Sequence, residues 1–136
     1  MAYVIGFVFS KSLDRVVMIK KNRPDFLAGK LNGVGGKVDA NELPTHAMRR
    51  ECREETGLDI IRWIKFSTIE IESNGVIVHC FFAVSNRIDS AETRTDEPVS
   101  IHEISSLSSL NTNEPCCDLI NKAVKIAANL NDPNRW

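Results

Sequence analysis

Short runs of apolar residues alternate with polar stretches in the first part of the chain. Residues 2–10 and 15–20 are rich in Val, Ile and Phe and are separated by a polar turn, so the pattern predicts two strands. Residues 21–39 lose this pattern and contain Pro24 and several glycines. Such a composition is typical of loops, and we expect a loop here.

The next segment has the end signals of a helix. Pro44 suits the first helical turn and Gly57 suits the position just past the last one, so a helix of about three turns is predicted over residues 44–56. Leu43 stands at the expected N-cap without a side-chain oxygen, and we therefore expect this end of the helix to fray.

A β-hairpin is predicted after this helix. Residues 66–72 and 76–85 have strand character and flank Asn74-Gly75, a dipeptide that is typical of tight hairpin turns. We expect these two segments to be the longest antiparallel strands.

The remaining chain contains a loop, a short strand and a second helix. Residues 87–96 are polar, residues 99–101 have strand character, and residues 116–130 carry apolar side chains at helical spacing. Strands combined with one internal and one terminal helix predict an α/β fold, in which a mixed sheet is covered on both faces. A length of 136 residues without a linker or repeat predicts one domain over residues 1–136.

Composition narrows the classes of partner. The chain is 43% apolar and 26% charged, as in a globular protein, and its net charge of -1 gives no general attraction to nucleic acid or to an anionic membrane. Residues 2–10 are too few to span a membrane and lack the basic start and cleavage site of a signal peptide, so we expect an intracellular, cytoplasmic protein. The four cysteines lack metal-binding spacing and are expected to be reduced and mostly buried.

The predicted helix over residues 44–56 contains the first candidate chemistry. Glu51, Glu54 and Glu55 stand at spacings of three and four, so their carboxylates share one face and can converge on one point. The alternative is an exposed helix with salt bridges, because arginines are interleaved with the glutamates. Two features weaken this alternative: like charges at these spacings cost roughly 0.2 to 0.5 kcal/mol per pair, and Arg50 precedes Glu54, the weaker orientation for a helical ion pair.

Three neighbouring carboxylates are suited to a divalent cation. Mg²⁺ prefers hard oxygen ligands and usually binds through a few carboxylates, water and substrate phosphates. Charge balance favours the same interpretation, because a nucleoside triphosphate cannot approach three ionised glutamates without a cation. We therefore expect a Mg²⁺ site, with Mn²⁺ as the alternative ion.

Residues 36–58 also form a longer motif. They run GKVDANELPTHAMRRECREETGL and match every fixed position of the Nudix box: a glycine, a glutamate, Arg-Glu, Glu-Glu and a second glycine at the required spacings. The chain thus resembles the Nudix hydrolases, in particular the MutT-type members. This resemblance implies the Nudix fold, an α/β/α sandwich around a mixed, mainly antiparallel sheet.

The resemblance also implies roles for individual residues. The implied metal ligands are the carbonyl oxygen of Gly35 and the carboxylates of Glu51, Glu54 and Glu55. Arg50 would orient the glutamates by ion pairing, and Glu42 would support them. Attack of water on phosphorus requires a base, for which Glu54 is the first choice and Glu51 the second.

Further candidates lie outside the box. Glu97 precedes the last predicted strand and matches a later glutamate that approaches the metals in MutT-type relatives, although an ordinary loop charge is an equal alternative. Lys37 follows the glycine pair and can contact a phosphate. Arg23, Lys20 and Lys21 are weaker candidates for the same role, and solvation at the surface is their default interpretation.

Two asparagines are candidates for reading the base. Asn32 lies in a segment that is similar to the loop of eukaryotic oxidised-purine triphosphatases, in which an asparagine hydrogen-bonds the base, but Asn-Gly is also a good turn. Asn113 begins an Asn-Glu-Pro sequence like that of bacterial MutT enzymes, but it can equally cap the last helix.

The expected function is the Mg²⁺-dependent hydrolysis of a nucleoside triphosphate to the monophosphate and pyrophosphate, with an oxidised or ordinary purine deoxynucleotide such as 8-oxo-dGTP preferred. The alternatives are a Nudix hydrolase for ADP-ribose, a nucleotide sugar or a capped RNA end, and a non-catalytic domain that senses a nucleotide. The downstream proline typical of ADP-ribose enzymes is missing between Pro44 and Pro98. We expect a small nucleotide as the partner, no nucleic acid or membrane, and a monomer or homodimer.

Overall fold

Strand β1 (Ala2–Phe9) lies in the middle of the sheet in the computed structural model, which describes residues 1–130. It pairs in parallel with β6 (Val76–Val84) along its whole length and antiparallel with β4 (Val34–Lys37). Residues 131–136 of the predicted single domain lie outside the described part. The predicted mixed sheet is thus confirmed.

The other strands extend the sheet on both sides of this centre. The order is β3-β2-β1-β6-β5, with β4 paired to β1 and β7 paired to β2. The bounds of these outer strands are Arg15–Lys20 for β2, Leu31–Asn32 for β3, Ile64–Ile71 for β5 and Val99–Glu103 for β7. The predicted hairpin is confirmed, since β5 and β6 pair antiparallel around a turn in which Gly75 has a φ of 69°.

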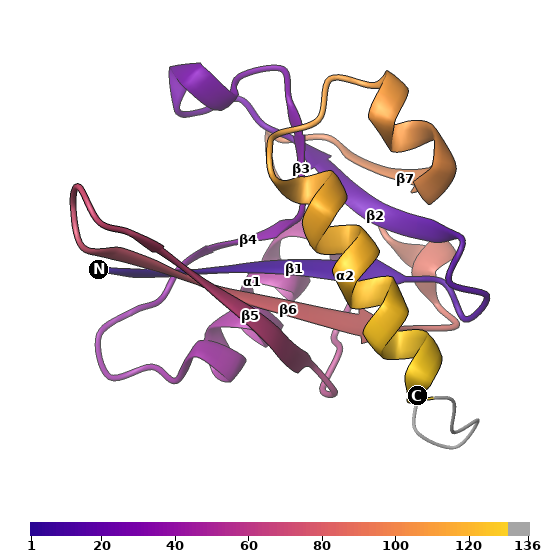
Figure 1. The fold of residues 1–136 in the computed structure, drawn as a ribbon, viewed down its shortest axis with the longest axis horizontal. Coiled ribbons are helices and arrows are strands. Elements are labelled where there is room, and N and C mark those ends of the chain that lie inside the picture. The colour runs from indigo at the N-terminus through magenta and orange to yellow at the C-terminus, as the bar shows by residue number, and fades with distance from the viewer. Residues whose placement is uncertain (131–136) are drawn as a thin grey trace.

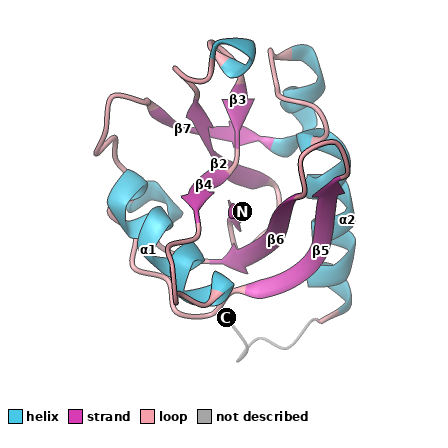
Figure 2. Cartoon of the chain, turned by 90° about the vertical axis from the view of Figure 1, so that its left-hand side faces the viewer, coloured by secondary structure: helices cyan, strands magenta, loops and turns pink. Residues whose placement is uncertain are grey.

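Helices α1 (Pro44–Thr56) and α2 (Cys116–Asn129) cover opposite faces of the sheet, as Figure 1 and Figure 2 show. Alternation along β1 makes this possible, because successive side chains of a strand point to opposite faces. Val4 and Val8 belong to the core under α1, whereas Phe7 and Phe9 belong to the core under α2. The expectation of a sheet covered on both faces is confirmed.

The ends of α1 agree with the prediction from Pro44 and Gly57. Pro44 occupies the first turn, and Gly57 closes the helix with a φ of 78° and an N–H that donates to the carbonyl of Arg53 at 2.9 Å. A left-handed residue at this position is the role in which glycine is favoured. Leu43 is the N-cap and makes no side-chain capping bond.

The prediction of a simple loop over residues 21–39 was wrong. This segment contains the short helix η1 (Asp25–Leu27) and the strands β3 and β4. Glycine has low strand propensity, so only the pairing of Gly35 and Gly36 with β1 reveals β4. Two further short helices, η2 (Ile88–Ser90) and η3 (Ile104–Ser109), were also not predicted.

The helices of the fold were compared with the length and apolar character that a membrane span requires. No helix within residues 1–130 has the length and apolar character needed to cross a bilayer.

Candidate active site

Two carboxylates of α1 reach two adjacent glycines of β4. The N–H of Gly35 donates to Oε1 of Glu55 at 2.7 Å. A Cβ placed on Gly36 would lie 2.7 Å from Oε1 of Glu51, so a side chain at this position would displace that carboxylate. The glycines therefore let the helix face and the strand approach closely enough for both carboxylates to meet the backbone.

The backbone conformation and surroundings of residue 35 also require a glycine there. Its φ is 152°, and a Cβ there would lie 2.0 Å from the carbonyl oxygen of Val4 on β1. A backbone carbonyl in a paired strand cannot move aside, so only glycine fits between β1 and α1.

Arg50 joins the carboxylates of the box into one network. Its Nε and Nη2 donate to the two oxygens of Glu42 at 2.8 and 3.0 Å, and its Nη1 donates to Glu51 at 3.0 Å and to Glu54 at 3.3 Å. Nη2 also donates to the carbonyl of Lys37 at 3.1 Å. A bidentate pair of this kind is strong and directional, and it holds the pKa of Glu42 down to about 2.

Glu55 is the most deeply buried of the three helix carboxylates. It is 8% exposed, and burial raises its pKa to about 8 against the hydrogen bond from Gly35. The neighbouring Glu51 and Glu97 raise this pKa further, whereas Lys21 lowers it. Burial also raises the pKa of Glu51, and Arg50 opposes that effect. Burial and the neighbouring carboxylates thus disfavour the ionised forms of Glu51 and Glu55 in the absence of a cation.

The donor chemistry of this site fits a divalent cation. Glu51 and Glu55 offer hard oxygen ligands at the same two-residue stretch of backbone, and Glu54 lies one turn from Glu51 on the same face. Within residues 1–130, no three His, Cys, Asp or Glu side chains are already arranged as a metal cluster. In this structure Arg50 donates to Glu51 and Glu54, and the N–H of Gly35 donates to Glu55.

Glu97 lies in the loop before β7 and is buried there, unlike a charge that is solvated at the surface. It is 5% exposed and accepts hydrogen bonds from Nζ of Lys21 at 3.0 Å and from the backbone N–H of Asn22 at 2.7 Å. Burial alone would raise its pKa, but these two donors outweigh burial and lower it. Lys21 is half-buried in this ion pair and is not solvated as an exposed surface lysine would be.

The two asparagines proposed as base readers lie in contact although they are far apart in sequence. Nδ2 of Asn113 donates to Oδ1 of Asn32 at 3.3 Å. Asn32 belongs to β3 and pairs with Ile19, so it is not part of a turn. Helix α2 begins at Cys116 with Pro115 as its N-cap and no side-chain capping bond, so Asn113 does not cap it.

The basic candidates outside the ion pair of Lys21 are exposed. Lys37 ends β4 and is exposed. Arg23 is exposed and its guanidinium is paired with Asp96 at 2.5 Å, so a phosphate would have to compete with that carboxylate. Lys20 ends β2 and is also exposed.

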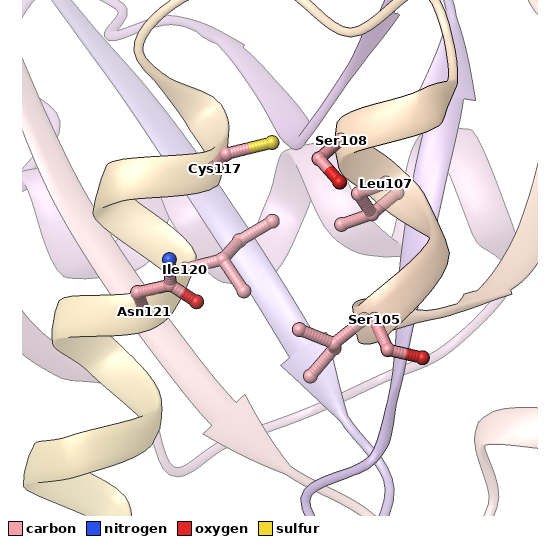
Figure 3. A pocket seen from close by; sticks show the side chains of 7 residues that line it. Ser105, Leu107, Ser108, Cys117, Ile120 and Asn121 are labelled. Carbon is pink, nitrogen blue, oxygen red and sulfur yellow. The ribbon is translucent and has the colours of Figure 1, made fainter.

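A separate cavity of about 240 Å³ lies between η3 and α2 (Figure 3). Its lining includes Ser105, Ser108, Cys117 and Asn121 but no carboxylate and no residue of the box. The chemistry described above therefore lies outside this cavity.

Sequence reasoning missed the contacts that hold the candidate residues in place. The ion pair of Lys21 with Glu97 and the contact of Cys116 with Asn32 join segments that have no shared motif. The sequence contained a weak signal for β4, because the apolar Val34 interrupts the glycine-rich segment. In the structure, Val34 is fully buried.

Comparison with known proteins agrees with this architecture. The family model of the NUDIX domain matches residues 2–116. An oxidized purine nucleoside triphosphate hydrolase from Danio rerio is 39% identical over 88 residues, which are 62% of this chain and 56% of that protein. An 8-oxo-dGTP diphosphatase from Buchnera aphidicola is 33% identical over 67 residues, which are 49% of this chain and 50% of that protein.

The chain thus spans about half the length of the curated relatives it matches. Among solved structures, one from a study of MutT from Aliivibrio salmonicida and Vibrio cholerae has a TM-score of 0.72 at 17% identity, covering 91% of this chain and 95% of that chain. At this identity the likeness concerns the fold.

Proposed function

Because this chain belongs to the NUDIX domain family, we propose that it hydrolyses a nucleoside triphosphate to the monophosphate and pyrophosphate in a Mg²⁺-dependent reaction. The observation that carries the proposal is the approach of Glu51 and Glu55, from one helix face, to the adjacent glycines of β4. Partly buried carboxylates in this arrangement suit a cation-dependent reaction on an anionic substrate.

The residues of the box have distinct roles in this proposal. Glu51, Glu54, Glu55 and the carbonyl oxygen of Gly35 would hold the cation. When bound, Mg²⁺ or Mn²⁺ supplies charge neutralisation for the phosphoryl oxygens and lowers the pKa of water. Arg50 orients Glu51 and Glu54 through the hydrogen bonds of one nitrogen, so their positions depend on each other.

Glu54 is the preferred general base. Its side chain is 54% exposed, whereas that of Glu51 is 16% exposed, so a water molecule has freer access to Glu54. A base must lie within hydrogen-bond reach of the water that it deprotonates. Glu97, held by Lys21 near Glu55, is the proposed further carboxylate that approaches the metals.

The substrate in this proposal is a purine deoxynucleotide, oxidised or ordinary. The contact of Asn32 with Asn113 supports it, because two amides side by side can hydrogen-bond one edge of a base. The printed names of the Danio rerio and Buchnera aphidicola relatives support an oxidised purine. Lys37 and Arg23 are the proposed phosphate contacts.

A panel of nucleotides tests the proposal. Purified protein with Mg²⁺ is incubated with ordinary and oxidised deoxynucleoside triphosphates, ADP-ribose, a nucleotide sugar and a capped RNA end. We expect pyrophosphate and monophosphate from the purine triphosphates. Preferred cleavage of another diphosphate would replace the substrate class, and binding without hydrolysis would indicate a sensing domain.

Two variants connect the activity to the site. Glu54→Gln is expected to lower kcat by at least about 100-fold, the usual contribution of a general base, without changing the thermal unfolding temperature. Glu72→Gln, an exposed glutamate after β5, is the matched control and should keep full activity. Unchanged hydrolysis in Glu54→Gln would contradict the assignment of the base.

A further inference from the structure

The thiol of Cys116 contacts one of the two proposed base-reading asparagines. Cys116 is the first residue of α2 and is fully buried, and its Sγ donates to Oδ1 of Asn32 at 3.1 Å. The same oxygen accepts the bond from Nδ2 of Asn113 at 3.3 Å. The carbonyl oxygen of the Asn32 amide thus accepts from two donors, one on the first residue of α2 and one in the segment just before this helix.

Two asparagine amides in contact can pair in either of two ways. In one, the carbonyl of the first accepts from the second, and in the other both amides are rotated by half a turn and the roles are exchanged. The two arrangements have nearly the same shape, so packing distinguishes them poorly. A neighbouring group that can only donate toward the pair removes this ambiguity.

Cys116 is such a group. Burial raises its pKa to about 12, although a hydrogen bond with the backbone of Gly33 opposes this effect, so the sulfur keeps its proton at neutral pH. The backbone of Gly33 donates its hydrogen bond to the sulfur, so the proton of the thiol remains available to donate to Asn32. The S–H therefore favours the arrangement in which the carbonyl of Asn32 faces α2.

We propose that Cys116 is a positioning residue that sets the orientation of the Asn32 amide and thereby selects which hydrogen-bonding edge of a base the Asn32–Asn113 pair reads. This inference rests on the proposed function, since it concerns recognition of the nucleotide base. In this orientation the NH₂ of Asn32 and the Oδ1 of Asn113 remain for the ligand.

A pair that presents one donor and one acceptor suits a base edge with one acceptor and one donor. The N7 and O6 atoms of guanine are both acceptors. Oxidation at C8 places a hydrogen on N7, and the same edge then offers the O6 acceptor beside an N–H donor. The pair as oriented by Cys116 thus suits the oxidised edge and leaves an unmatched acceptor opposite the ordinary one.

Substitution of Cys116 with and without a donor tests this inference. Cys116→Val removes the proton at similar volume, and Cys116→Ser keeps a donor. Cys117→Val is the matched control, because the neighbouring thiol lines the cavity between η3 and α2 (Figure 3). If Cys116→Val does not fold, Cys116→Ala provides the same comparison.

The readout is binding of the two monophosphates, oxidised and ordinary deoxyguanosine monophosphate, by calorimetry, together with kcat and KM for the triphosphates. In Cys116→Val we expect the ratio of the two Kd values to fall roughly three- to tenfold, the effect of one hydrogen bond, with kcat unchanged. Cys116→Ser and Cys117→Val should keep the wild-type ratio.

An unchanged ratio in Cys116→Val, or no discrimination in the wild-type protein, would overturn the inference. A parallel loss of kcat in all variants would also overturn it, since that result indicates a structural role. The proposed function fails separately, if wild-type protein hydrolyses none of the triphosphates, because monophosphate binding does not require catalysis.

Discussion

Gly35 and Gly36 are neighbours, but the structure requires glycine at each for a different reason. At Gly35 a Cβ would meet the backbone carbonyl of Val4, which cannot move. At Gly36 it would meet the end of the Glu51 side chain, which can move away. The first glycine is therefore needed for folding, and the second is needed for the position of a carboxylate.

Alanine at each glycine should separate these two roles. Gly36→Ala is expected to keep its thermal stability and to lose roughly 100-fold in kcat/KM, because the Glu51 carboxylate is displaced. Gly35→Ala is expected to lose about 1 to 3 kcal/mol of stability, from a strained backbone. Thermal unfolding and steady-state kinetics check both, and a similar stability loss in both variants would contradict this interpretation.

The burial of Glu55 links stability to pH in metal-free protein. Its pKa rises from 4.5 to about 8 on folding. Between these values the folded state binds a proton that the unfolded state lacks, so the free energy of unfolding falls as pH rises through this window and levels off above it.

Glu55→Gln should remove this dependence while keeping an oxygen for the N–H of Gly35. In EDTA at pH 9 the variant is expected to be more stable than wild type by on the order of 2 kcal/mol, with a smaller difference at pH 5. Urea unfolding at the two pH values measures this, and added Mg²⁺ should stabilise wild type more than the variant. Parallel pH profiles would show that Glu55 is ionised freely.

Helix α1 begins without a capping side chain although it supplies most of the candidate site. Leu43 has the extended backbone of an N-cap, with φ -75° and ψ 145°, but makes no side-chain cap bond and is 61% exposed. The N–H groups of the first turn thus lack a partner that serine would supply. Helix α2 also begins without a side-chain capping bond, but its N-cap is Pro115, whereas the N-cap of α1 is an exposed leucine.

Leu43→Ser is therefore expected to stabilise the protein by about 1 kcal/mol through a new cap. The kcat and KM values should not change, because the Leu43 side chain makes no hydrogen bond to the carboxylates of the box. Leu43→Ala separates the new cap from loss of the leucine. A gain of the same size in Leu43→Ala would assign the effect to removal of exposed apolar surface.

The pairing of β2 with β7 brings Lys21 and Glu97 together beside α1. Ile19 pairs with Val99, and the N–H of Lys20 donates to the carbonyl of Pro98 at 2.9 Å. The next residue on each side then forms the buried ion pair at 3.0 Å. Three segments that are distant in sequence thus complete one charged site.

Lys21→Met should leave Glu97 buried without its counter-charge. We expect a loss of about 3 kcal/mol in the free energy of unfolding, because an unpaired buried charge is more costly than a lost pair. The double variant Lys21→Met with Glu97→Gln should recover most of it, and Lys20→Met is the exposed control. Denaturant unfolding measures the cycle, and additive losses would show that the pair is not coupled.

Local features of the sequence predicted much of the fold and of the helix face that carries the candidate metal ligands. Pro44 and Gly57 bounded α1 correctly, and the spacing of Glu51 and Glu55 placed both carboxylates toward β4. Asn74-Gly75 predicted the hairpin for the same kind of reason, since a turn depends on the residues that form it. Helical period and turn chemistry act over a few residues and can be recognised in the sequence.

The sequence by itself thus determined the helices, the longer strands and the face on which the box carboxylates lie. Only the tertiary structure decided that Gly35 and Gly36 form a strand, that Glu97 is buried against Lys21, and that Asn32 meets Asn113. Asn32 and Asn113 are 81 residues apart, so their contact depends on sheet register and on where α2 packs. Such contacts arise from burial and pairing across the whole domain, which no local pattern encodes.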